Sequence, residues 1–117
     1  MSEILVSQLI NANGNANANQ FILHYNSNVT NKPYVAFQSY DSRVCEIATE
    51  GGLGFRKVVT FGRDYNYSKT TSKHLNEFLI QNGLSCLASA KDRHEAIERG
   101  HARMDETIAV RYDETLY

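Results

Sequence analysis

The sequence predicts an α+β domain in which two helices pack on an antiparallel sheet of about four to six strands. Apolar residues alternate along short segments between residues 21 and 61, which is typical of strands. Two later segments begin with hydroxyl residues that can cap a helix. The predicted order of elements is strands, helix, strand, helix, strand, which favours helices packed on one face of a sheet.

Size and composition indicate a single domain. The chain has 117 residues, enough to bury one core, and we expect residues 1–117 to form one unit. No segment approaches the roughly 20 apolar residues of a membrane span, and residues 1–10 do not resemble a signal peptide. Cys45 and Cys86 form no C-x-x-C pair, so we expect free thiols. These features predict a soluble cytoplasmic protein without membrane contact.

The N-terminal part contains an ambiguous segment and a low-complexity tract. Residues 4–10 are compatible with an amphipathic turn or a short strand, and periodicity does not decide between them. Residues 11–19 combine asparagine with glycine and alanine. Because asparagine favours turns and left-handed backbone, we predict that residues 11–19 form a flexible Asn-rich loop.

Four predicted strands follow this tract. They cover residues 21–25, 34–40, 43–49 and 55–61. Asp41 and Ser42 mark a hairpin turn between the second and third of them, and further turns are predicted at residues 29–33 and 51–54. We expect an antiparallel meander with one face covered and the other exposed to solvent.

The first helix is predicted to run from about Ser68 or Thr70 to Gln81, with Gly83 as its stop. Its buried stripe consists of Leu75, Phe78 and Leu79, with Thr71 one turn earlier.

The rest of the chain is predicted as strand, helix and strand. Residues 84–88 are short and apolar, which favours a strand. Ser89 begins a capping box that opens a charged helix to about Arg103, and residues 107–112 alternate as a final strand. Five charged residues of this helix are expected on an exposed face with i, i+4 ion pairs: Lys91, Arg93, Glu95, Arg99 and Arg103.

Positive charge gathers at the start of the first helix. Lys69 and Lys73 lie beside backbone N–H groups that point outward, and the helix dipole adds partial positive charge there. The segment 56–73 is basic, whereas residues 105–117 are acidic. We therefore predict a site for a negatively charged group. Its residues are Arg56, Lys57, Arg63, Tyr65, Tyr67, Ser68, Lys69, Thr70, Lys73 and His74.

This basic segment allows two kinds of partner. Tyr65 and Tyr67, beside the cations, could stack on the bases of single-stranded nucleic acid. Tyr67 could instead pack at the helix entry, and the net charge of −1 argues against a general electrostatic nucleic-acid binder. The same surface could meet an acidic protein.

Histidines provide the remaining candidates for chemistry. His74 could act as a general base, or it could pack and bond a backbone carbonyl of the preceding loop. His94, Glu98 and His101 share one face of the second helix, as metal ligands or as solvated residues. Gly100 weakens that helix where a metal site would need rigidity. Since no nucleophile has an evident partner and no phosphate-loop or zinc-finger spacing occurs, we predict no catalytic residues, metal or cofactor.

Two motifs resemble a known family. Residues 37–45 read FQSYDSRVC, and residues 67–79 read YSKTTSKHLNEFL. They resemble a family of small uncharacterised proteins carried by bacteriophages, plasmids and their hosts. That family shares an F-x-S-Y-x-S/T-x-I/V strand pair and a Y-S-x-T-T-x-K-H-x-x-x-F-L helix. The resemblance covers residues 34–80 and leaves out the Asn-rich tract and the charged helix.

The resemblance implies a compact accessory protein of mobile elements and supplies no reaction. Small phage proteins of this size commonly interfere with host defences such as CRISPR or restriction systems. We therefore predict a non-enzymatic, anti-CRISPR-like protein that binds and inhibits a host protein or ribonucleoprotein effector in the host cytoplasm. It would occlude a nucleic-acid-binding surface or block a conformational step. The alternatives are a nucleic-acid-binding accessory protein that uses residues 56–73 and, third, a metal-dependent enzyme; a homodimer is left open.

Overall fold

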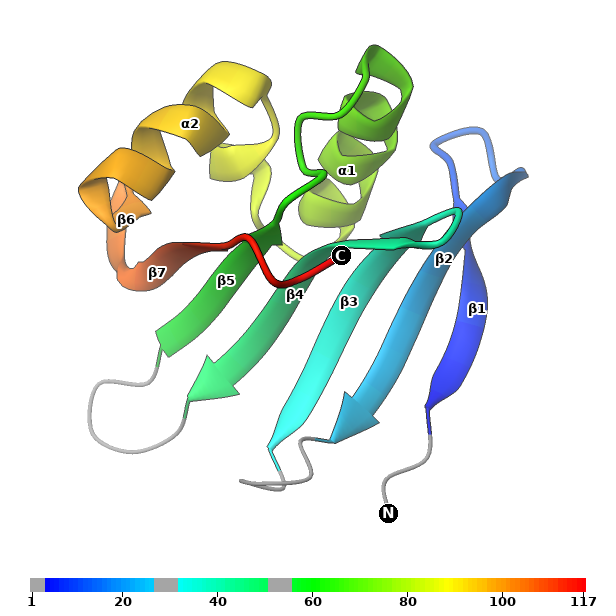
Figure 1. Ribbon diagram of the computed structural model, residues 1–117, viewed down its shortest axis with the longest axis horizontal. Coiled ribbons are helices and arrows are strands. Elements are labelled where there is room, and N and C mark those ends of the chain that lie inside the picture. The colour runs from blue at the N-terminus through cyan, green and yellow to red at the C-terminus, as the bar shows by residue number, and fades with distance from the viewer. Residues whose placement is uncertain (1–3, 27–31, 51–55) are drawn as a thin grey trace.

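The described residues form one seven-stranded sheet. The structure is a computed structural model, and it describes residues 4–26, 32–50 and 56–117. The strands are β1 (Leu5–Ile10), β2 (Ala16–Asn26), β3 (Pro33–Ser39), β4 (Ser42–Glu50), β5 (Arg56–Gly62), β6 (His101–Ala102) and β7 (Asp105–Asp113). Their order across the sheet is β1-β2-β3-β4-β5-β7-β6, which can be followed in Figure 1.

Every neighbouring pair of strands is antiparallel except β5 and β7, which run parallel. The chain leaves the end of β5, crosses over through the helices and returns along β5 in the same direction, as a parallel pair requires. The α+β class is confirmed. The sheet is mostly antiparallel, as predicted, but it has seven strands instead of about four to six, and β5 pairs with β7 in parallel. The prediction missed β6, which is too short to show a period, and it left β1 undecided.

Two α-helices lie between β5 and β6 in the chain. The first, α1 (Lys69–Gln81), begins at Ser68, whose side-chain oxygen accepts a hydrogen bond from the Thr71 amide at 3.1 Å. The second, α2 (Ala90–Arg99), begins at Ser89, whose side-chain oxygen accepts a hydrogen bond from the Asp92 amide. Both helix starts confirm the predictions from capping residues.

The type of one predicted element and the end of another were wrong. Residues 84–88 contain a short 3-10 helix, η1 (Ser85–Leu87), instead of a strand, because a short apolar run does not distinguish the two. The second helix ends at Arg99 and not near Arg103. Gly100 there adopts φ 86°, a left-handed conformation that ends helices.

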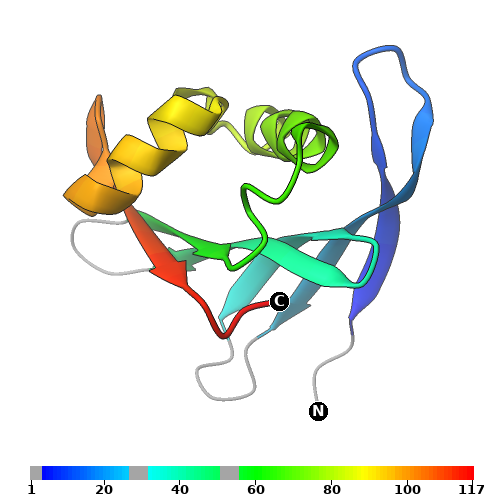
Figure 2. The ribbon, with the colours of Figure 1, turned by 45° about the horizontal axis from the view of Figure 1, so that its top comes forward.

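The core lies between the helices and one face of the sheet. Figure 2 shows α1 and α2 together on that face. The predicted stripe of Leu75, Phe78 and Leu79 is confirmed, since all three side chains are fully buried. Phe78 stacks on Phe37 of β3, with ring centroids 5.7 Å apart. Burial of each such side chain stabilises the fold by roughly 1.5–3 kcal/mol. No helix in the described part of the chain has the length and apolar character that a membrane span requires.

The Asn-rich tract forms the tip of a β-hairpin. Residues 16–19 already belong to β2, so the prediction of a loop over residues 11–19 was wrong for its second half. The Asn11 side-chain oxygen accepts hydrogen bonds from the backbone amides of Asn13 at 2.9 Å and Asn15 at 3.0 Å. Asparagine therefore builds the turn through its own side chain.

The predicted hairpin of β3 and β4 is confirmed, with its turn at Tyr40 and Asp41. The predicted turn at residues 51–54 and most of that at residues 29–33 lie outside the described residues. Residue 55 also lies outside them.

The charged helix contributes a buried cation. Arg93, expected on an exposed face, is 1% exposed, and its guanidinium donates hydrogen bonds to α1 side chains and to an η1 carbonyl. Burial lowers the pKa of Arg93. Within the described residues, Glu95 forms neither of its predicted ion pairs, with Lys91 or with Arg99. Met104, in the turn between β6 and β7, is exposed.

Candidate functional site

A cleft opens between the turn that follows β3 and the start of α1. Its volume is about 580 Å³. The first wall comes from the β3–β4 turn, and the second comes from the loop after β5 and the first turn of α1. The described residues that line it are Ser39, Tyr40, Asp41, Ser42, Val44, Asp64, Tyr67, Ser68, Thr70 and Thr71.

Every described lining residue except Asp64 belongs to one of the two motifs that resemble the phage and plasmid family. Residues 39–42 come from the first motif, and Tyr67, Ser68, Thr70 and Thr71 come from the second. The motifs are separated in the sequence by more than twenty residues, yet the fold brings them to one cavity. The polar residues of both motifs therefore share a surface, while their apolar residues, such as Phe37 and Phe78, build the core beneath it.

The first wall is held by an unusual backbone conformation. Tyr40 has φ 54°, in the left-handed region that few residues other than glycine adopt. Its amide donates a hydrogen bond to the Asn19 carbonyl at 2.7 Å, and its carbonyl accepts one from the Gln38 side chain at 2.9 Å. The strained residue is thus fixed by β2 and β3, although its own side chain is 59% exposed.

The second wall is ordered by the helix cap. Ser68 Oγ accepts a hydrogen bond from the Thr71 amide and donates one to Thr71 Oγ1, each at 3.1 Å. One further bond joins the two walls, because Ser42 Oγ donates to Asp64 Oδ2 at 2.7 Å. The cleft is therefore a preformed feature of the fold.

The charge inside the cleft is the opposite of the prediction. Asp41 and Asp64 line it, and no lysine, arginine or histidine occurs among its described lining residues. Lys69 and Lys73 are exposed on α1 next to the cleft without lining it. The site therefore combines carboxylates and hydroxyls in its interior with two lysines on the adjoining helix.

The predicted basic segment does not form one surface. The Lys57 ammonium donates a hydrogen bond to the Asn82 carbonyl at 2.8 Å, at the opposite end of α1 from Lys69. The Arg63 guanidinium lies over the Tyr117 ring, 4.0 Å from its centroid. The backbone of Arg56 pairs with the end of β4, and its side chain is not described. The Lys57 and Arg63 cations are therefore engaged by groups outside the start of α1.

The two predicted stacking tyrosines have different environments. Tyr67 is 78% exposed and lines the cleft. Tyr65 is buried, where its ring packs against Phe61 and Tyr112, and its hydroxyl lies 3.3 Å from His94 Nδ1. Burial raises the pKa of the Tyr65 hydroxyl. Tyr65 is therefore part of the packing, and the prediction that it presents its ring to a ligand was wrong.

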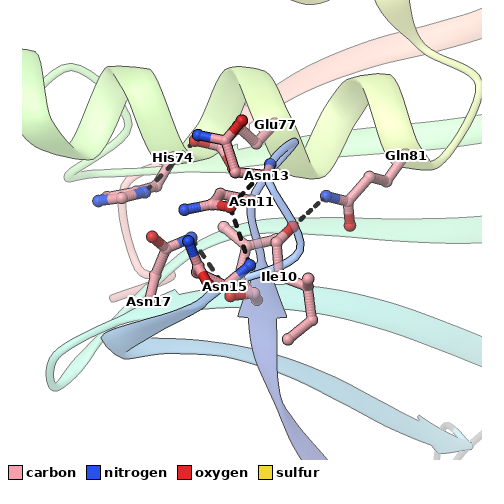
Figure 3. Close-up of polar contacts among 9 residues, drawn as sticks. Ile10, Asn11, Asn13, Asn15, Asn17, His74, Glu77 and Gln81 are labelled. Carbon is pink, nitrogen blue, oxygen red and sulfur yellow. Dashed lines mark hydrogen bonds and ion pairs between the residues drawn. The ribbon is translucent and has the colours of Figure 1, made fainter.

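His74 lies on a different side of α1 from the cleft. Figure 3 shows His74 and Glu77 facing the asparagines of the β1–β2 hairpin tip. His74 Nδ1 is 3.9 Å from Glu77 Oε1 and has no hydrogen-bond partner among the described residues. The side chain is largely buried, so His74 is a packing residue, which was one of its two predicted roles. It packs beside Glu77, and the predicted bond to a carbonyl of the preceding loop is not formed in the described part of the chain.

The histidines of the second helix do not converge. His101 belongs to β6, because α2 ends at Arg99, and its ring contacts the Ala102 carbonyl. His94 Nε2 lies 3.7 Å from Glu98 Oε1, and both side chains are exposed. The proposed i, i+4, i+7 spacing therefore fails at its third residue. The described residues contain no cluster of three or more histidine, cysteine or acidic side chains that could hold a metal.

Reasoning from charge missed half of the cleft. Ser39, Tyr40, Asp41 and Ser42 were assigned only to a hairpin, and Asp64 only to a loop. The signal that could have found the first four was the motif at residues 37–45, which contains all of them, whereas Asp64 lies outside both motifs.

A comparison with known proteins finds a family without a known activity. Residues 5–96 match the model of a family described as a family of unknown function (DUF8033). The matched segment contains both motifs and every described lining residue of the cleft. No curated protein and no solved structure gives a significant match.

Proposed function

The chain belongs to this family of unknown function, and we propose that it is a non-enzymatic accessory protein of a phage or mobile element. In this proposal, the cleft between the β3–β4 turn and α1 binds a host defence protein or ribonucleoprotein and inhibits it.

The observation that carries the proposal is the meeting of the two motifs at one cleft with exposed aromatic side chains. Tyr40 is 59% exposed and Tyr67 is 78% exposed, one on each wall. Tyrosine is enriched at protein interfaces because it offers a large ring and a polar hydroxyl at low conformational cost. The hydrogen bonds that fix both walls reduce the cost of ordering on binding.

The polarity of the cleft favours a polypeptide partner. Asp41 and Asp64 can accept hydrogen bonds from arginine or lysine side chains, which are abundant on surfaces that bind nucleic acid. Lys69 and Lys73 can pair with acidic residues beside such a surface. Phosphate groups would be repelled by the two carboxylates inside the cleft. The nucleic-acid-binding surface of a defence effector fits this mixed charge, and binding of the cleft there would occlude that surface.

The test is capture of a partner that depends on the cleft. The full chain is co-expressed with tagged host defence effectors, and retained protein is measured by pull-down, together with phage survival in the same cells. We expect a stoichiometric complex and increased phage survival. The double variant Tyr40→Ala/Tyr67→Ala should lower retention at least about tenfold, as expected when anchor residues are removed.

Met104→Ala is the matched control, because Met104 is 84% exposed and lies outside the cleft. It should retain the partner as the parent chain does. Circular dichroism checks that both variants are folded. Absence of any stoichiometric partner, with unchanged phage survival, contradicts the inhibitor proposal. A complex that survives the double variant unchanged contradicts the cleft as its site.

A second candidate function is nucleic-acid binding by the outer surface of α1. Lys69 and Lys73 are exposed one helical turn apart, and neither pairs with an acid among the described residues. If this surface binds DNA or RNA, affinity should fall steeply with salt and be lost in Lys69→Ala/Lys73→Ala. Lys91→Ala, on the exposed start of α2, should bind as the parent chain does. No binding at low salt removes this candidate.

A further inference from the structure

The edge strand β1 exposes an uncharged apolar surface. β1 is the last strand at one end of the sheet formed by the described residues, as can be followed in Figure 1. Its sequence LVSQLI contains no charged residue and no proline. Leu5 is 65% exposed, Val6 60% and Ile10 44%. Proteins usually protect an edge with charges, proline or a short strand, because free backbone groups pair with other strands.

The opposite edge of the sheet is shorter and more charged than β1. β6 has only two residues and β1 has six, although both edge strands shift register against their neighbour, β6 between His101 and Ala102 and β1 between Gln8 and Ile10. Arg103, Asp105 and Glu106 follow directly and are exposed. The contrast indicates that β1 is kept free for pairing.

We propose that β1 pairs antiparallel with β1 of a second copy of this chain, so that the sheet continues across a two-fold axis. A two-fold contact sets a strand against its own copy, and residues near the axis face themselves. A charge near the axis would then meet its own copy, and like charges directly opposite each other destabilise cross-strand pairs. β1 carries no charge, so an identical copy is a partner that it accepts without repulsion.

Both faces of the paired strands would gain apolar contacts. Successive residues of a strand point to opposite faces, so Leu5 and Val6 would each contact the partner copy on a different face. The partner's backbone would satisfy the outer N–H and C=O groups of β1.

The strand is already fixed in the conformation that pairing needs. Leu9 is fully buried in the core, and the Ile10 carbonyl accepts a hydrogen bond from the Gln81 side chain at 2.6 Å. An ordered strand loses little further entropy on association. No residue of β1 is among the described residues that line the cleft, so dimerisation leaves the cleft available in each copy.

Sedimentation equilibrium on the full chain tests the proposal. At about 100 μM, a concentration that reveals micromolar dimers, we expect twice the chain mass of 13.2 kDa. Ser7→Lys, at an exposed position in the middle of β1, should return the mass to that of one chain, because it sets lysines near each other across the axis. Ser7→Thr, which adds no charge, should remain dimeric. Met104→Lys, next to the other sheet edge, should also remain dimeric.

A second readout locates the contact. Backbone amides of residues 5–10 should exchange with deuterium more slowly as protein concentration rises. If the parent chain has the mass of one chain at about 100 μM, the proposal is overturned, and a strand from a different protein becomes the alternative partner of β1. A dimer that persists in Ser7→Lys, with unchanged exchange at residues 5–10, also overturns it.

Discussion

The guanidinium of Arg93 donates a hydrogen bond of 2.5 Å to the side-chain oxygen of Asn76, which joins α2 to α1. The same group donates to Ser72 Oγ at 2.6 Å and to the Leu87 carbonyl at 3.0 Å. Arg93 forms no ion pair with a carboxylate among the described residues. A buried charge is therefore held by neutral oxygens from both helices and η1, and these bonds set how the helices sit on the sheet.

Replacement of Arg93 should destabilise the protein. In Arg93→Met, an unbranched apolar side chain replaces the stem of Arg93, but the buried Leu87 carbonyl and the partly buried Ser72 Oγ and Asn76 Oδ1 lose their donor. We expect the free energy of unfolding to fall by about 3 kcal/mol, the scale of several lost bonds to a charged group. Urea denaturation followed by circular dichroism measures it.

The control for this prediction is Arg103→Met, because Arg103 is exposed in the turn between β6 and β7. Its cost should be below about 0.5 kcal/mol. If Arg93→Met is as stable as the parent chain, the buried cation is not what joins the helices.

The fold was predictable wherever local chemistry decides the structure. Ser68 and Ser89 were recognised as helix caps because a hydroxyl before an apolar stripe satisfies free amides. Arg93 was placed on the wrong face because helical spacing alone shows only charged neighbours. The oxygens that hold it come from α1 and η1, which only the tertiary fold brings close. The parallel pairing of β7 with β5 likewise depends on a crossover that periodicity does not reveal.

The candidate site was only partly predictable. The start of α1 was located correctly as an exposed feature with Tyr67 and Ser68, since helix caps have a local signature. The acidic character of the cleft was missed because Asp41 and Asp64 lie in turns, where acids are common and carry no distinct signal. The charge count over residues 56–73 also combined Lys57 and Lys69, which lie at opposite ends of α1 in the fold.

Removal of the α1 cap should weaken both the helix and the cleft wall. Ser68→Ala removes the oxygen that accepts the Thr71 amide and leaves that helical N–H without its partner. We expect a loss of about 1 kcal/mol in the free energy of unfolding, measured by urea denaturation. Thr70 is exposed in the same first turn of α1, so Thr70→Ala should lower the free energy of unfolding by less than half as much. Equal costs for the two variants would show that the cap contributes nothing specific.

The β1–β2 hairpin tip should loosen when its bond to α1 is removed. Gln81 Nε2 donates to the Ile10 carbonyl at 2.6 Å, a contact between positions 71 residues apart that can be followed in Figure 3. In Gln81→Ala, local opening of the tip should become more favourable by about 1 kcal/mol, which raises amide exchange at residues 11–15 roughly fivefold. Ile80→Ala, exposed next to it, should leave the exchange of the tip unchanged. Unchanged exchange in Gln81→Ala would contradict the docking role of the bond.

Alkaline pH should destabilise the protein through Tyr25. Burial, together with the hydrogen bond that its hydroxyl donates to Glu46 Oε1 at 2.5 Å, raises the pKa of Tyr25 above its ordinary value of 10.0. The unfolded chain therefore releases this proton at a lower pH than the folded protein does. The stabilisation is complete below about pH 10 and is lost as pH rises through the folded pKa.

The free energy of unfolding of the parent chain should accordingly fall between about pH 10 and pH 11, by less than 1.4 kcal/mol per pH unit from this group, since the ring is half-buried and partly screened. Tyr25→Phe cannot release the proton, so its decline should be shallower over the same range, while Tyr65 still contributes in the same direction. Urea denaturation at a series of pH values measures both slopes. Parallel slopes for the two proteins would show that the hydroxyl of Tyr25 is not held in its protonated form by Glu46.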